Sequence, residues 1–226
     1  SGFLITSILA EELDAGTFSL WQFYERRVRR IFPALFFVLG VTTVLAWALL
    51  IPPQLEAYSK SLAAVVLFVS NFLFAAKTGY FSPALEEAPL LHTWSLAVEE
   101  QFYLLFPLAL AALHRRARRW LPLALGLMAA LSLALAIWGS KAEPQINFFF
   151  PLSRAWELLA GSTAAIWVRK RSVAPNEAWA GLGLLAILAS LVLHSDATPY
   201  PGLATLLPVM GTVAVVLWAG QTTLVG

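Results

Sequence analysis

The sequence predicts an all-α fold, a polytopic bundle of membrane helices. Apolar residues make up 59% of the chain and charged residues only 12%, and this charged share is about half of what an ordinary soluble domain carries. Apolar runs rich in Leu and Ala recur along nearly the whole sequence and lack the period-two alternation of barrel strands. No polar stretch is long enough to fold separately, so we expect one membrane domain over residues 1–226, with the lipid bilayer as a partner.

About seven runs have the length and composition of spanning or re-entrant helices. Proline, acidic residues or arginine separate them, as expected at helix ends. Residues 1–9 are too few to cross a ~30 Å hydrocarbon core, which takes about 20 helical residues. We therefore interpret them as an N-terminal helix stub, the end of a span. The seven runs, in chain order, are 31–51, 61–76, 94–113, 120–138, 146–168, 178–193 and 202–220.

Basic residues gather at the ends of these runs, which indicates membrane orientation rather than nucleic-acid binding. If every run crossed fully, the second and third clusters would lie outside, against the rule that places Lys and Arg on the cytoplasmic side. All three clusters lie inside if residues 61–92 enter and leave on one side, so we expect a re-entrant or broken segment there. The clusters are Arg26, Arg27, Arg29 and Arg30; Arg115, Arg116, Arg118 and Arg119; and Arg169, Lys170 and Arg171.

Two carboxylates, Glu99 and Glu100, enter the otherwise apolar run 94–113, and Tyr103 lies one helical turn beyond Glu99 on the same face. Because an ionised carboxylate in lipid costs at least about 2.5 kcal/mol, these groups should face a partner or a wet cavity. Glu99 is therefore a candidate for a polar functional site. The alternative is a purely structural pair with an arginine that holds two helices together.

A second charged pair, Arg154 and Glu157, stands three residues apart on one predicted helix face, where the two groups can neutralise each other. A structural role is at least as well supported as a functional one. One turn further on, Gly161 and Ala165 form a face of small residues on which another helix can pack closely.

Arg27 and Arg30 precede Pro33, a residue suited to the first turn of a helix. If a helix begins there, both guanidinium groups stand at its N-terminus, where backbone N–H groups favour an anion, and arginine can fork onto phosphate oxygens. The alternative is an ordinary topology signal.

Other kinds of site have little support in the sequence. There is no cysteine, which excludes disulfides and thiol catalysis. No glycine-rich phosphate loop or cluster of metal ligands is present, so we expect no bound metal and no permanently bound cofactor. His92 stands three residues before Ser95, but this pair has no defined third partner for nucleophilic catalysis. His114 and His194 lie at the ends of runs and are expected at the membrane interface.

Taken together, these runs resemble the acyltransferase-3 family of bacterial integral-membrane O-acyltransferases. The resemblance extends over most of the chain, and the order and spacing of its motifs make it more specific than any one of them. The HTWSLAVEEQFY form is most similar to the subgroup that often carries a fused SGNH domain. The motifs are SGFLIT at 1–6, FYERRVRRIFPAL at 23–35, LFVSNFLFA at 67–75, GYF at 79–81, PLLHTWSLAVEEQFYLLFP at 89–107 and RAWELLAG at 154–161.

The resemblance implies a multi-pass protein of the bacterial inner membrane that transfers an acyl group, usually acetyl, from cytoplasmic acyl-coenzyme A to a hydroxyl of a surface polysaccharide. Acceptors in such proteins include lipopolysaccharide O-antigen, peptidoglycan and exopolysaccharide. By the same resemblance, the Arg-x-x-Arg motif at Arg27 and Arg30 is associated with the coenzyme A donor. The catalytic candidate is Glu99, with supporting roles for the residues that match the remaining motifs, namely Trp94, Tyr103, Arg154 and Glu157.

The catalytic histidine proposed for the family lies in a first transmembrane helix that would precede Ser1, and no histidine of this sequence matches it. We therefore expect residues 1–226 to be a partial transmembrane domain that is inactive alone, with the C-terminal helices and any SGNH domain missing.

The sequence is also compatible with two other functions. Buried charge pairs and broken helices also mark transport paths, so a transporter or flippase for a lipid-linked or small acidic substrate is the main alternative. A noncatalytic assembly protein is the third.

Overall fold

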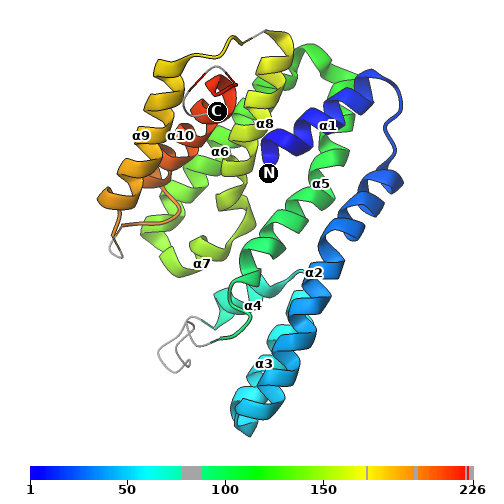
Figure 1. Ribbon diagram of the computed structural model, residues 1–226, viewed down its shortest axis with the longest axis vertical. Helices are drawn as coiled ribbons and strands as arrows, with labels where there is room; N and C mark the ends of the chain where they lie inside the picture. The colour runs from blue at the N-terminus through cyan, green and yellow to red at the C-terminus, as the bar shows by residue number, and fades with distance from the viewer. Residues whose placement is uncertain (78–87, 172, 196–197, 222, 224–226) are drawn as a thin grey trace. The chain divides into compact units, whose positions relative to one another are not determined.

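The computed structural model describes residues 1–77, 88–171, 173–195, 198–221 and 223, and every regular element in these ranges is a helix. The chain divides into two compact units, Thr17–Pro107 and a second unit made of Ser1–Gly16 and Leu108–Gly226. Figure 1 shows the helices with their labels. The predicted all-α class is confirmed for the described residues.

The Thr17–Pro107 unit contains α2 (Leu20–Leu49), α3 (Pro52–Val66), α4 (Ser70–Ala76) and the first part of α5 (Thr93–Ala117). Ser19 caps α2, because its side chain accepts a hydrogen bond from the backbone N–H of Gln22. Pro52 and Pro53 suit the first turn of α3, where backbone N–H groups have no partner within the helix. The two helices therefore follow each other with only Leu50 and Ile51 between them.

The start of α2 contradicts one prediction. The helix does not begin near Pro33 but 13 residues earlier, at Leu20, and Pro33 lies inside it. Arg27 and Arg30 are consequently in the body of a helix rather than at its N-terminus. The reason is local: a serine cap precedes Leu20, and the helix continues through the proline.

The expected break within residues 61–92 is confirmed between α3 and α4. Phe68 takes a left-handed backbone conformation with φ of 53°, and α4 resumes at Ser70. The side-chain amide of Gln101, on α5, donates to the carbonyl of Phe68 at 2.7 Å and to Asn71 Oδ1 at 2.9 Å. Residues 78–87, including the GYF motif, lie outside the described residues, so re-entry into the membrane stays a prediction.

The core of this unit joins α2 to α3. Tyr58 is 3% exposed and its hydroxyl lies 3.0 Å from Thr42 Oγ1 and 2.9 Å from Thr43 Oγ1. These hydrogen bonds satisfy a polar group that would otherwise be buried alone. The apolar side chains of the same cluster are Leu35, Leu39, Ala46, Val65 and Leu90.

The other unit contains the end of α5 and six further α-helices. They are α1 (Gly2–Asp14), α6 (Leu121–Ala142), α7 (Pro144–Phe149), α8 (Pro151–Lys170), α9 (Glu177–Leu193) and α10 (Leu206–Trp218), with short 3₁₀ turns η2 (Arg118–Trp120) and η3 (Leu203–Thr205). The run predicted at 146–168 is thus two helices, because Pro151 starts a new one after an extended Phe150.

Glycines allow two pairs of helices in this unit to approach closely. A Cβ at Gly2 of α1 would overlap the backbone of Leu158, and one at Gly161 would lie 2.9 Å from the backbone N of Phe3. The predicted close packing at Gly161 is therefore confirmed, with α1 as the neighbour. Gly183 and Gly211 play the same part between α9 and α10, which lie side by side in Figure 1.

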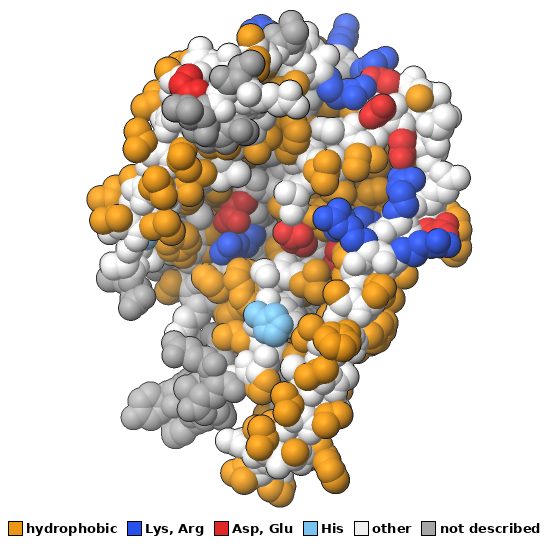
Figure 2. Space-filling model, in the orientation of Figure 1, with side chains coloured by type: hydrophobic (Ala, Val, Ile, Leu, Met, Phe, Trp, Pro, Cys, Tyr) orange, Lys and Arg blue, Asp and Glu red, His pale blue; other side chains and the backbone are white. Residues whose placement is uncertain are grey.

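Large apolar side chains cover the outward surfaces of both units. Trp47 and Phe37 of α2, Leu131 of α6 and Leu191 of α9 are all well exposed. Figure 2 shows apolar side chains spread over one face of the molecule. Two stretches are long and apolar enough to cross a membrane among the residues described, Leu20–Leu49 and Thr93–Ala142. The count of about seven spans stays a prediction.

Candidate functional site

Three of the predicted site residues, Arg27, Glu99 and Tyr103, come together in the Thr17–Pro107 unit, on facing turns of α2 and α5. Arg27 of α2 lies with NH2 3.4 Å from Glu100 Oε1, and its guanidinium carbon is 3.9 Å from the centroid of the Tyr103 ring. The Tyr103 hydroxyl donates to Glu99 Oε2 at 3.0 Å. A continuous chain of polar contacts thus links Glu100, Arg27, Tyr103 and Glu99, which we call the Arg27 cluster.

The predicted Glu99 and Tyr103 neighbours are confirmed as a hydrogen-bonded pair. Tyr103 is 2% exposed and Glu99 is half-buried. One turn of helix separates the two residues, so the phenol reaches back along the helix to the carboxylate. The hydrogen bond fixes one carboxylate oxygen of Glu99.

Glu100, for which the sequence predicted a polar partner but no site role, lies at the centre of these contacts. It, rather than Glu99, forms the ion pair with Arg27, and the two side chains are only 16% and 14% exposed. The signal was present, because Glu100 and Tyr103 are three residues apart and share a helix face. What the sequence could not provide is the partner, since Arg27 and Glu100 are 73 residues apart.

The two arginines of the Arg-x-x-Arg motif have different surroundings. Arg27 is enclosed by Glu100 and Tyr103, and its buried Nε has no hydrogen-bond partner among the described residues. Arg30 is exposed. The stack on Tyr103 orients the planar guanidinium. Arg27 is therefore held in a fixed position, whereas Arg30 can reorient in solvent or at a membrane surface.

Polar contacts fix the α5 turns on either side of the Arg27 cluster. Tyr24 Oη donates to the carbonyl of Leu104 at 2.8 Å, which ties α2 to α5 one turn beyond Glu100. Ser70 Oγ donates to the carbonyl of Thr93 at 3.1 Å. Trp94, the remaining residue predicted from this motif, stands half-buried near the start of α5. These contacts restrain the helix backbone that carries both glutamates.

The second predicted pair lies in the other unit. Arg154 NH2 is 3.3 Å from Glu157 Oε2 on α8, and both side chains are about four-fifths buried, which confirms the predicted ion pair. The guanidinium of Arg154 also lies 5.4 Å from the ring centroid of Phe148. Glu157 forms part of the wall of a cavity of about 250 Å³, which α1, α8 and α10 otherwise line with mostly apolar side chains.

The arrangement suits acid–base and anion chemistry. Ser95 donates to the backbone carbonyl of His92 at 3.2 Å rather than to its ring, so this pair has no nucleophilic geometry. No group of three metal-ligating side chains occurs within the described part of the chain. The Arg27 cluster offers a fixed cation for a phosphate and, beside it, a carboxylate that can accept a proton.

Comparison with known proteins gives these motifs a context. The family model described as "Acyltransferase domain" (acyltransferase-3) matches residues 1–223. The chain is 33% identical over 234 residues to an uncharacterized protein of Haemophilus influenzae, and the match covers 98% of this chain and 96% of that protein.

A second kind of relative is longer. The chain is 40% identical over 141 residues to the O-acetyltransferase OatA of Staphylococcus aureus strain NCTC 8325, and the match covers 61% of this chain and 23% of OatA. OatA of strain COL gives the same values. The chain thus matches about a quarter of these relatives' length. No solved structure shows a significant match to the chain.

Proposed function

The chain belongs to the acyltransferase-3 family, and on this premise we propose that it acts as a membrane O-acyltransferase, moving an acetyl group from acetyl-coenzyme A to a hydroxyl of a cell-surface polysaccharide. Lipopolysaccharide O-antigen, peptidoglycan and exopolysaccharide are the acceptor classes that fit this role. The family is generally membrane-integral, and the relatives found are bacterial. The proposal therefore includes a multi-pass location in the bacterial inner membrane.

The observation that carries the proposal is the contact of Arg27 with both Glu100 and Tyr103, because it joins a buried cation to the candidate base Glu99. Acyl transfer from a coenzyme A thioester needs two such elements: a cation for the donor phosphates and a group that accepts the proton of the attacking hydroxyl. Here one tyrosine contacts both, through its ring and its hydroxyl.

Arg27 is the donor-binding candidate with fixed geometry. A guanidinium can fork onto two phosphate oxygens, and it forms stronger hydrogen bonds to an anion than a neutral donor does. Arg30, exposed one turn further along α2, supplies a second cation that can adjust to the ligand. The Arg27 and Glu100 contact, at 3.4 Å, is longer than a charge-assisted hydrogen bond of about 2.8 Å, so a phosphate can compete with this carboxylate.

Glu99 is the candidate for positioning or deprotonating the acceptor hydroxyl. In that step the hydroxyl oxygen attacks the thioester carbonyl carbon, the C–S bond breaks, and the proton passes by way of the carboxylate to the leaving thiolate. One oxygen of Glu99 is held by Tyr103, and a fixed base is more effective than a mobile one because its orientation needs no adjustment.

Donor binding tests the assignment of the arginines. The full-length protein and an Arg27→Ala/Arg30→Ala variant should differ by at least about tenfold in their Kd for coenzyme A, since two charged hydrogen-bonding groups are lost. An Arg29→Ala variant is the matched control, because Arg29 is in the same basic cluster but is 78% exposed and pairs with Glu25. Equal affinities for all three proteins contradict the donor assignment.

Product analysis separates transfer from transport. Mass spectrometry of surface glycans from cells with and without the intact gene should show acetyl esters only when the gene is present. Loss of these esters in an Arg27→Ala/Arg30→Ala strain with normal protein levels supports acyl transfer. Unchanged glycans, together with movement of a labelled lipid-linked or small acidic substrate across the membrane, would instead identify a transporter.

A further inference from the structure

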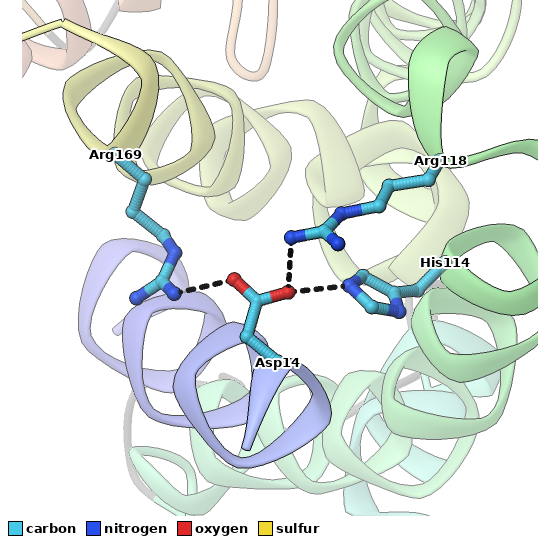
Figure 3. Close-up of polar contacts among 4 residues, drawn as sticks. All are labelled: Asp14, His114, Arg118 and Arg169. Atoms are coloured by element: carbon cyan, nitrogen blue, oxygen red, sulfur yellow. Dashed lines mark hydrogen bonds and ion pairs between the residues drawn. The ribbon is translucent and has the colours of Figure 1, made fainter. Parts of the chain in front are cut away.

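Asp14, at the end of α1, holds three basic side chains that come from two other regions of its unit. Arg169 NH2 lies 2.8 Å from Asp14 Oδ2, and His114 Nε2 lies 2.9 Å from Asp14 Oδ1. Arg118 contacts the same Oδ1. Figure 3 shows the three side chains converging on the carboxylate. We call these four residues the Asp14 cluster.

The Asp14 cluster assembles a larger basic surface from segments that are far apart in sequence. Its arginines come from η2 and from the last turn of α8, and each is flanked by further cations. Because Asp14 joins these helix ends, the flanking cations are brought to one end of the unit. All of them are exposed: Arg115, Arg116, Arg119, Lys170 and Arg171. Figure 2 shows Lys and Arg side chains gathered with acidic ones where α1, α5 and α8 end.

Tryptophans lie at the same helix ends. Trp167 is in the last turn of α8, Trp179 in the first turn of α9 and Trp218 at the end of α10. Trp218 is 5.5 Å from Trp179 and 6.4 Å from Trp167, measured between ring centroids. Trp120, at the start of α6, is 51% exposed. Tryptophan is enriched where helices pass from hydrocarbon to headgroups.

Arginines stack on two of these tryptophans. The guanidinium of Arg119 lies 5.3 Å from the Trp120 ring centroid, and that of Arg171 lies 5.8 Å from Trp167. Beyond the tryptophan level the outward side chains are apolar, as at Leu123 and Leu127 of α6, which are 52% and 56% exposed. The order along the helices is therefore basic, aromatic, then apolar, which is the order of a bilayer from its surface inward.

We propose that this end of the unit binds anionic phospholipid headgroups, with the exposed arginines around the Asp14 cluster contacting lipid phosphates. Seven Lys and Arg side chains meet four acidic side chains at these helix ends, Glu11, Glu12 and Asp14 of α1 and Glu177 of α9, so positive charge is in excess. Clustered cations at a membrane surface attract anionic lipid. This proposal does not depend on acyl transfer.

The surroundings favour a lipid phosphate over a soluble one. The surface is made of exposed helix ends, and neither of the two cavities described in this unit is lined by any of its seven cations. A soluble phosphate compound would gain nothing from the adjoining apolar belt. A phospholipid uses all three layers at once, because its phosphate, glycerol region and acyl chains lie at matching depths.

The test measures lipid selectivity of the full-length protein in phosphatidylcholine vesicles containing trace spin-labelled phosphatidylglycerol or spin-labelled phosphatidylcholine. Electron paramagnetic resonance gives the protein-bound fraction of each label. The wild type should prefer phosphatidylglycerol. Replacing Arg115, Arg116, Arg119 and Arg171 by Gln should reduce this preference by at least about fivefold, since each charge near the surface contributes measurably. If the four substitutions together impair folding, an Arg115→Gln/Arg116→Gln variant is measured in place of the fourfold variant.

A matched pair of single variants shows whether clustering matters. Arg119 comes two residues before α6 and Lys141 lies in its last turn, and a helix of this length, at 1.5 Å per residue, places them about 30 Å apart. Arg119→Gln should weaken the preference more than Lys141→Gln. Equal effects, or an unchanged preference in the multiple variant, contradict the proposal. The proposal is also contradicted if coenzyme A or inorganic phosphate, added at constant ionic strength, abolishes the preference of the wild type for phosphatidylglycerol. That result would show that the surface binds soluble phosphate.

Discussion

The Arg27 cluster and the Asp14 cluster both join distant helices through charge, but they do so with opposite balance and burial. In the Arg27 cluster one cation meets a carboxylate and a phenol, and its ion pair is only 14% and 16% exposed. In the Asp14 cluster one carboxylate meets three basic groups; the side chains of Asp14, Arg118 and Arg169 are 31%, 67% and 32% exposed, and that of His114 is 13% exposed. The first cluster is enclosed, whereas the second faces outward.

This difference in exposure determines what each cluster can do. Charges that water reaches are screened, so an exposed pair changes stability little but remains available to outside partners. Enclosed charges interact strongly with one another and with a bound ligand, and removing one leaves the other without compensation. Substitutions in the Arg27 cluster should therefore have large effects on catalysis and folding, and those in the Asp14 cluster small effects on folding.

The largest effect is expected at Glu99. If its carboxylate takes the proton of the acceptor, Glu99→Gln should lower the rate of acetyl transfer by about 10²- to 10⁴-fold, because the amide cannot act as a base. Coenzyme A binding should stay unchanged. Tyr103→Phe should lower the rate less, since it removes only the hydrogen bond to Glu99.

Glu56→Gln is the control for Glu99, because Glu56 is an exposed glutamate that pairs with Lys60. Both variants are compared with the wild type by the initial rate of acetyl transfer in membranes with equal protein levels. A Glu99→Gln protein as active as the control excludes the proposed role as a base.

The local part of the fold and of the candidate site could be predicted from the sequence, and the missing part has a physical cause. Hydropathy predicted the helices, and the four-residue spacing of Glu99 and Tyr103 predicted that their side chains are neighbours. Both features depend on residues that are close in sequence. The same holds for Arg154 and Glu157. Local reasoning failed at the start of α2, where a serine cap outweighed the proline signal.

Contacts between distant segments could not be read from spacing. The Arg27 partner, Glu100, is 73 residues away, and Asp14 contacts Arg169 across 155 residues. His114 was expected at the membrane interface from its place at the end of a run, but its carboxylate partner was not foreseen. The packing of α1 against α8, in which Gly2 and Gly161 allow close approach, brings Asp14 near Arg169.

Glu100 should show the next largest effect, on stability. Glu100→Ala leaves the buried guanidinium of Arg27 with no carboxylate in contact, and breaking a buried pair in this way costs about 3 kcal/mol. Glu100→Gln should cost less, because the amide oxygen can still accept a hydrogen bond. Thermal unfolding in detergent, followed by circular dichroism, measures the difference.

The matched control for Glu100 is Glu25→Ala, on the same helix as Arg27. Glu25 pairs with Arg29 at 2.7 Å, which is closer than the Arg27 contact, but both side chains are well exposed. Its loss should cost under about 1 kcal/mol. If Glu100→Ala and Glu25→Ala lower the stability equally, burial does not determine how much an ion pair of this protein contributes to stability.

The smallest effect is expected at Asp14, and it should depend on pH. The hydrogen bond from Arg169, aided by His114 and by the charge of Arg118, lowers the pKa of Asp14 below its usual value. A carboxyl whose pKa is lower in the folded than in the unfolded state stabilises the fold above its unfolded pKa of about 3.9, and this contribution disappears as pH falls through the folded pKa. Asp14→Asn should therefore lower the free energy of unfolding by about 1 kcal/mol at neutral pH, since solvent reaches the cluster.

Because the asparagine does not titrate, the difference between wild type and variant should shrink as pH falls below about 4. Unfolding measured for both proteins from neutral to acid pH gives this difference directly, and the other carboxyl groups, common to both, largely cancel. A constant difference would show that Asp14 acts by packing rather than by charge. A loss as large as that of Glu100→Ala would show that the Asp14 cluster is as effectively enclosed as the Arg27 cluster, against the exposure of Asp14 and Arg118.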